Sequence, residues 1–194
     1  MSLKELRVAT NSVAGRSAGR GATDGESTIV SKTPFNINDK EAIEAAFSKF
    51  AEEVADSDIE KAIVFSPDGY RYDIIGTANM VNIELIGKES LKGAIDIHNH
   101  TRKFPDSFSR DDFVNFFEYK TAMMEVVYNG KRHRMEWDET IKRPTDVEAH
   151  ALYNNAWYAI HEEAKEKGQR VQAEHYEVML YLQKTVKGLR FHEL

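Results

Sequence analysis

The chain of 194 residues contains no cysteine. This absence excludes a disulfide scaffold, a cysteine-liganded zinc site and a cysteine nucleophile, so any bound metal must be held by histidine, aspartate or glutamate. No apolar run reaches the length of a membrane-spanning helix, and the N-terminal residues lack the apolar core of a secretory signal. We therefore expect a cytoplasmic protein with no membrane partner.

An excess of basic residues is also absent, because the formal net charge is −6 at pH 7. The overall charge therefore predicts no nucleic-acid partner. Internal repeats, a phosphate-binding P-loop and a dinucleotide-binding glycine motif are missing as well. Hydrophobic residues make up 41% and charged residues 30% of the chain, which is typical of a soluble globular protein. Its length is sufficient for one domain with a hydrophobic core and additional segments.

The first segment, residues 1–36, is rich in glycine, serine, alanine and threonine and poor in large apolar side chains. Such a segment cannot bury enough surface to offset the entropy lost on ordering. We expect a flexible N-terminal arm. Two hypotheses stay open: a disordered tail, or an arm that becomes ordered on an assembly partner or a second copy of the chain.

The remainder alternates between extended and helical patterns, which predicts an α+β fold. Extended segments are predicted at residues 59–65, 70–75, 94–97, 122–128 and 131–137. Helices are predicted from Asn38 or Asp39 onward and at residues 109–119, 144–167 and 169–187. Residues 79–93 fit neither pattern firmly. The last two helices are predicted to form an antiparallel hairpin that either covers the sheet or presents an assembly surface.

Two pairs of polar residues stand out around the segment 94–97. His98 and His100 follow this apolar segment two residues apart, so in an extended chain both imidazoles point to the same side. Ser109 and Asp112 stand three apart at the start of a helical pattern and face one way from its first turn. Two imidazoles and a carboxylate would leave a fourth tetrahedral position for water, as in catalytic zinc sites. The structural alternative is that Ser109 and Asp112 form only a helix-capping box.

At these residues the chain resembles the JAMM (MPN) metallopeptidase superfamily, whose motif is His-x-His-Pro followed by Ser-x-x-Asp. His98, His100, Ser109 and Asp112 match the motif, whereas Thr101 replaces the proline and the connecting loop is one residue longer. Loops accommodate one insertion at low cost. The His-Asn-His sequence at positions 98–100 is most similar to that of the bacterial RadC-like and phage JAB-like branches. The other histidines, at positions 133, 150, 161, 175 and 192, are assigned to structure or solvent.

The resemblance implies a cytidine-deaminase-like layered fold, with a mixed sheet flanked by helices. The JAMM-like metal-binding domain would span residues 37–140, and residues 141–194 would form a helical pair packed on it or extending it. One zinc ion would be held by His98, His100 and Asp112. Ser109 would stabilise the oxyanion, and a glutamate on the first strand would act as general base.

Glu60 is the preferred candidate for this base, since it precedes an apolar run and an Asp-Gly turn as in the phage-type branch. Glu84 is the rival candidate. The structural alternative is that Glu60 is only a carboxylate on an edge strand with no catalytic role.

The function implied is a zinc-dependent peptidase or isopeptidase, of bacterial or phage-infected host cytoplasm, that binds a protein or peptide in extended form. Two alternatives stay open. The first is a non-catalytic structural or recruitment module of JAMM-like fold, associated with phage or prophage assembly, in which the N-terminal arm and C-terminal helices contact an assembly partner or further copies of the chain. The second is a DNA-repair accessory of RadC-like type, which the net charge disfavours.

Overall fold

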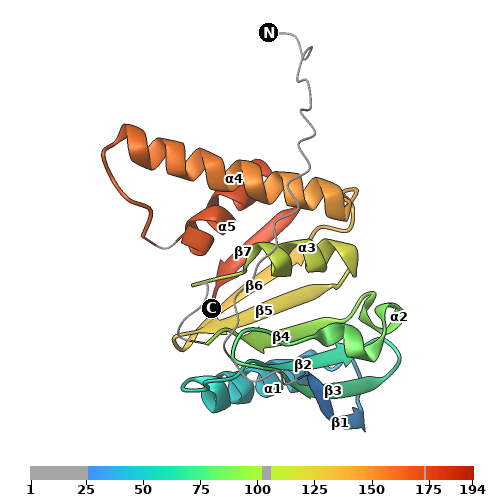
Figure 1. Ribbon diagram of the computed structural model, residues 1–194. Coiled ribbons are helices and arrows are strands. Elements are labelled where there is room, and N and C mark those ends of the chain that lie inside the picture. Colours follow the sequence, from blue (N-terminus) through green and yellow to red (C-terminus); the bar gives the residue numbers. More distant parts are fainter. Residues whose placement is uncertain (1–25, 102–105, 173) are drawn as a thin grey trace.

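A seven-stranded mixed β-sheet forms the centre of the computed structural model, which describes residues 26–101, 106–172 and 174–194 (Figure 1). Its strands are β1 (Thr28–Pro34), β2 (Lys61–Ser66), β3 (Tyr70–Ile75), β4 (Ile95–Asn99), β5 (Met123–Tyr128), β6 (Lys131–Trp137) and β7 (Leu189–Glu193). They lie in the order β1-β3-β2-β4-β5-β6-β7. Only β4 and β5 pair in parallel, and the chain between them carries a helix, as a parallel crossover requires.

Five α-helices and one 3₁₀-helix accompany the sheet within the described residues. They are α1 (Lys40–Val54), the 3₁₀-helix η1 (Ile83–Ile86), α2 (Lys88–Leu91), α3 (Arg110–Glu118), α4 (Asp146–Glu166) and α5 (Glu174–Thr185). The sequence-based expectation of an α+β fold with a mixed sheet flanked by helices is confirmed.

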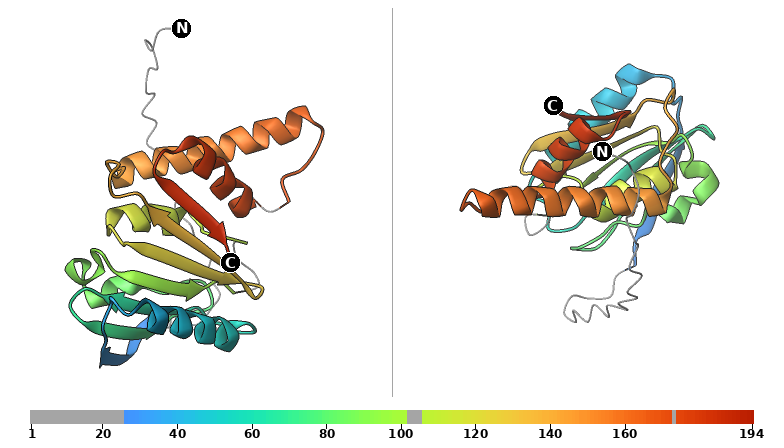
Figure 2. Two further views of the ribbon diagram at one scale, coloured as in Figure 1. Left: turned by 180° about the vertical axis from the view of Figure 1, so that it is seen from behind. Right: turned by 90° about the horizontal axis from the view of Figure 1, so that it is seen from above.

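Helix α1 covers one face of the sheet, which Figure 2 shows from behind and from above. Asp39 caps it by accepting the backbone N–H of Ala42 at 3.0 Å. The apolar side chains of this layer recur at helical spacing on α1 and at alternate positions on the strands beneath it, and they are Ile43, Phe47, Phe50, Val54, Ile63, Phe65, Ile97 and Val127. This pattern fixes which strand residues face the opposite side, because neighbouring strand residues alternate.

Helices α3, α4 and α5 pack on the other face (Figures 1 and 2). Their apolar side chains form one buried cluster with those of β5, β6 and β7, including Met124, Val126, Met135 and Phe191. The C-terminal helical pair therefore covers this face of the sheet.

The structure differs from the sequence-based predictions at both edges of the sheet. Residues 28–34, expected within the flexible arm, form the edge strand β1 and pair with β3. Residues 1–25 of that segment lie outside the described residues. At the other edge, β7 was not predicted, and it pairs with β6 after the turn at Gly188. Both are short edge strands whose pairing partners are distant in sequence.

The inner hairpins agree closely with expectation. Asn129 and Gly130 both have positive φ, at 49° and 75°, as a type I′ turn between β5 and β6 requires. The unassigned segment 79–93 contains only η1 and α2. Among the described helices, none combines the length and the apolar character needed to cross a membrane.

Candidate metal centre

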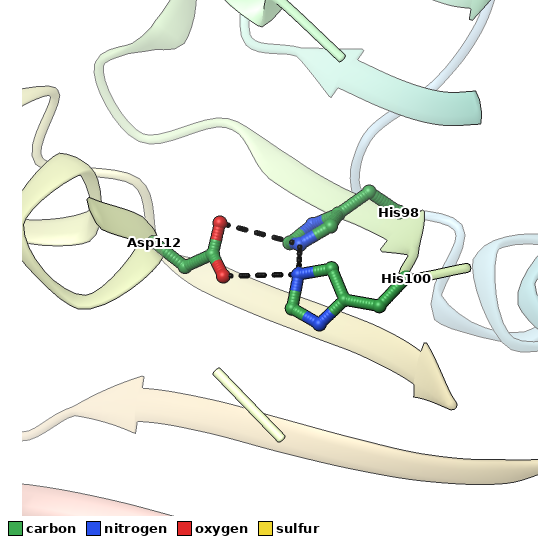
Figure 3. A group of neighbouring side chains, drawn as sticks. All are labelled: His98, His100 and Asp112. Atoms are coloured by element: carbon green, nitrogen blue, oxygen red, sulfur yellow. Dashed lines mark hydrogen bonds and ion pairs between the residues drawn. The ribbon is translucent and has the colours of Figure 1, made fainter. Parts of the chain in front are cut away.

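Strand β4 and the residue that follows it carry the two histidines on the sheet face that α3 covers. Antiparallel pairing places His98 opposite Ala62 of β2, and parallel pairing places it beside Val126 of β5. His98 and His100 are two residues apart and their rings lie on the same side of the strand (Figure 3). Both are buried, with 5% and 8% of their surface exposed.

Helix α3 brings Asp112 to these histidines through its N-terminal capping box. The Ser109 hydroxyl accepts the Asp112 backbone N–H at 3.1 Å, and Asp112 Oδ2 accepts the Ser109 backbone N–H at 2.7 Å. The capping box expected as a structural alternative is therefore present. It also fixes the Asp112 carboxylate, so capping and presentation of this carboxylate to the histidines are not exclusive.

The three side chains meet with their ligand atoms facing one another (Figure 3). His98 Nε2 lies 3.3 Å from His100 Nε2 and 3.4 Å from Asp112 Oδ1, and His100 Nε2 lies 3.2 Å from Asp112 Oδ2. A tetrahedral cation with nitrogen and oxygen ligands at about 2.0–2.1 Å would separate those ligands by about 3.3–3.4 Å. The donor atoms therefore fit a metal ion, and this buried group could hold one.

Charge at this centre is balanced between the imidazoles and the carboxylate. Burial lowers the pKa of His98, but the charge of Asp112 and the hydrogen bond to it outweigh burial and raise that pKa to about 10. Burial likewise raises the pKa of Asp112, but the two imidazoles outweigh it and hold that pKa well below its usual range. A bound cation would take the place of the imidazole proton as the partner of Asp112.

Glu60 lies on the same side of the sheet, immediately before β2. The pairing of Ala62 with His98, continued past the end of β2, brings Glu60 opposite His100. Glu60 is 5% exposed and lines one cavity of about 470 Å³ together with His98, His100 and Asp112. Burial raises its pKa, against the nearby imidazoles and a hydrogen bond from the Val81 backbone, which lower it. A raised carboxyl pKa suits a general base.

Asn99 holds the backbone on both sides of Glu60. Its side-chain oxygen accepts the Lys61 N–H at 2.8 Å, and its side-chain nitrogen donates to the Ile59 carbonyl at 3.1 Å. The residue between the two histidines thus ties β4 to the glutamate that faces them.

The loop that carries Val81 packs closely on the site. The Thr101 hydroxyl donates to the Ala78 carbonyl at 3.1 Å, so the residue that follows His100 anchors this loop. Gly76 is required there, because an added Cβ would lie 2.2 Å from the Met80 carbonyl oxygen. Residues 102–105 of the connecting loop lie outside the described residues.

The remaining site candidates also line the cavity. Ser109 stands beside Asp112, and its hydroxyl hydrogen stays available because the oxygen acts as the acceptor in the capping box. Glu84, the rival for the general base, is exposed and forms an ion pair with Lys88 at 3.4 Å. Hydrogen bonds from Tyr119 and Lys88 lower the pKa of Glu84. The surroundings of Glu84 therefore favour the ionised carboxylate, whereas those of Glu60 favour the protonated form.

Sequence reasoning overlooked Asp96 and Asn99. Asp96 stands two residues before His98 and is fully buried on the same side of β4. The signal for it was the alternation Asp-x-His-x-His along one strand, which was interpreted as an apolar run. The signal for Asn99 was weaker, since an amide between two histidines has no characteristic pattern.

The other histidines are not members of the group formed by His98, His100 and Asp112. His133 bonds to Ser107 at 3.0 Å, His161 to Glu174 at 3.1 Å and His175 to the Tyr153 hydroxyl at 2.7 Å. Within the part of the chain that the structure describes, they belong to no group of metal-capable side chains. Comparison of the chain with protein-family models, curated proteins and solved structures finds no significant match.

Proposed function

We propose that this chain is a zinc-dependent peptidase or isopeptidase of the JAMM type. The observation that carries the proposal is the convergence of His98 Nε2, His100 Nε2 and Asp112 at 3.2–3.4 Å beside the buried Glu60. Two imidazoles and one carboxylate are a ligand set that zinc accepts with a fourth position left for water. The spacing of the motif supports the same assignment independently of these distances.

His98, His100 and Asp112 would hold the ion. When bound, zinc would polarise the scissile carbonyl and lower the pKa of its water toward about 7. The capping box would keep Asp112 in place, since Oδ2 is already bonded to the Ser109 backbone. The residues therefore supply a preformed site on a strand and a helix rather than on loops alone.

Glu60 would act as the general base and then as the general acid. Its position on the histidine side of the sheet lets it take a proton from the attacking water and deliver it to the leaving amine. Its raised pKa matches this double role, because the carboxyl must both accept and release the proton near neutral pH. Asn99 and the Val81 N–H would hold it in position.

Ser109 would donate its hydroxyl hydrogen to the developing oxyanion. Removal of one such donor typically costs about 3 kcal/mol of transition-state stabilisation. The substrate would be an extended protein or peptide segment lying in the cavity lined by Asn79, Met80 and Asn82. These residues belong to the loop that Thr101 anchors.

The test is cleavage of a peptide library by zinc-loaded protein, with Glu60→Gln as the matched control that keeps the proposed ligands. Wild type is expected to cleave, and Glu60→Gln is expected to retain zinc while losing at least about 10²-fold in rate, since general acid–base catalysis contributes that much. Cleavage that persists in Glu60→Gln would contradict the assigned base. Cleavage that persists in His98→Ala would contradict the metal mechanism.

A second candidate is a non-catalytic structural or recruitment module of the same fold. It is favoured by one observation: the ion pairs of Asp112 with His98 and His100 already satisfy these side chains without a metal. Wild-type protein that stays metal-free after addition of zinc, and elutes as a stable oligomer, would support this candidate instead.

A further inference from the structure

Asp96 is the most unusual carboxylate near the centre. It is 0% exposed, and neither of its side-chain oxygens has a hydrogen-bond partner among the described residues. A buried polar group without a partner is costly, and a buried charge is more so. Such a group calls for a functional explanation when it lies beside a candidate metal site.

The two neighbours of Asp96 in the sheet are apolar. In the sheet register it lies opposite Val64 of β2 and beside Met124 of β5, both of which are buried. Nδ1 of His98 lies 3.9 Å from Asp96 Oδ1. This is longer than a hydrogen bond by about 1 Å.

The two ring nitrogens of His98 thus face two different carboxylates. Nε2 faces Asp112 and His100, where the candidate cation would lie (Figure 3). Nδ1 faces Asp96. A metal-ligating imidazole commonly donates its other N–H to a carboxylate, which fixes its tautomer and orientation and raises its basicity.

We propose that Asp96 is a positioning residue that accepts the Nδ1–H of His98 and so holds the ring with Nε2 aimed at the metal. This inference rests on the proposed metal-binding function. Asp96 lies 3.9 Å from Nδ1 of His98 and acts on the metal only through that ring.

The test compares Asp96→Asn and Asp96→Ala with wild type by zinc competition against a chromophoric chelator. Loss of such a partner typically weakens metal affinity about 10–100-fold. We expect a loss of this size in both variants, together with a shift in the ¹⁵N signals of His98 that reports the altered tautomer. We also expect the melting temperature of the metal-free protein to stay equal or rise, because an unpaired buried carboxylate has been removed. A merely structural residue would lower stability without changing the tautomer.

Thr121→Val is the matched control. Thr121 is also fully buried with an unpaired side-chain oxygen, but it does not line the cavity. Its replacement should leave zinc affinity unchanged.

Two results would overturn the inference, and they differ. If wild type binds zinc and His98→Ala does not, but both Asp96 variants bind within twofold of wild type, only the role of Asp96 is wrong. If wild type itself binds no zinc, the proposed function fails and the role of Asp96 fails with it.

Discussion

At the scale of single residues, the chemistry depends on which side chains are buried with a partner. His98, His100 and Asp112 satisfy one another, whereas Asp96 and Glu60 are buried carboxylates in less polar surroundings. Burial of these two carboxylates does not stabilise the folded protein, because an ionised carboxylate loses its hydration when it is buried. Their concentration around two imidazoles is therefore best explained by a site that receives a cation.

His133, which lies outside the candidate metal centre, makes the free energy of unfolding depend on pH. Burial lowers its pKa, and Ser107 bonds to its Nδ1 at 3.0 Å. Because the folded protein resists protonation of His133, its contribution to stability is complete above a pH of about 6.5 and is lost as the pH falls below that value.

We expect His133→Asn, which retains a polar atom near the Nδ1 position, to unfold with a weaker loss of stability between pH 7 and pH 5 than wild type. Chemical denaturation in the presence of a chelator measures this, because the chelator removes any competition between metal and protons. Parallel pH profiles for the two proteins would contradict the assignment.

At the scale of elements, the start of α3 has two roles in one motif. Ser109 and Asp112 cap the helix, and the same contacts present Asp112 to the histidines. Thr145 and Glu148 form an equivalent capping box at the start of α4. The chain thus contains its own control for separating capping from function.

We expect Ser109→Ala and Thr145→Ala each to lose about 1 kcal/mol of unfolding free energy, as removal of an N-cap typically does. Only Ser109→Ala should also slow cleavage, by about 10²-fold, because it alone removes the proposed oxyanion donor. Equal cleavage rates in the two variants would show that Ser109 serves as a cap alone.

Prediction from sequence succeeded where local patterns decide the structure. The apolar stripe of α1, the Asn129-Gly130 turn and the caps of α3 and α4 all depend on near neighbours in the chain. The strands β1 and β7 were missed because their stability comes from pairing with β3 and β6 rather than from their own composition. Polar β1 exposes most of its residues, so it carries no apolar alternation to detect.

As with the fold, only part of the candidate site could be predicted from the sequence. The two histidines, Ser109 and Asp112 could be proposed from spacing because a strand and a helix start have fixed periodicities. Asp96 shares the two-residue spacing of the histidines, but its complete burial depends on the register between β2, β4 and β5, and so do the contacts of Asn99. Such contacts are decided by sheet pairing, which no single segment encodes.

At the scale of the whole molecule, the sheet separates the candidate site from a charged network. Glu125 is fully buried beneath α1 and accepts bonds from Arg132 Nε at 2.8 Å and Arg134 Nε at 2.6 Å. Both arginines also reach Glu44 on α1, each at 2.7 Å. The network joins α1 to β5 and β6 on the face away from the histidines.

We expect Glu125→Gln to lose about 3–5 kcal/mol of unfolding free energy, because it leaves two arginines without their buried partner. Glu44→Gln removes the half-exposed member of the same network and should lose less than about 1 kcal/mol. Zinc affinity should be unchanged in both variants. Equal losses of stability, measured by denaturant titration, would mean that burial of Glu125 does not set the strength of the network.

The central claim is that His98, His100 and Asp112 bind one metal ion. Elemental analysis of purified protein, before and after incubation with zinc and removal of the excess, tests it most directly. We expect about one zinc per chain in wild type and in Glu60→Gln, and almost none in His98→Ala, His100→Ala or Asp112→Ala. A wild type without zinc, or variants that bind zinc as wild type does, would contradict the account.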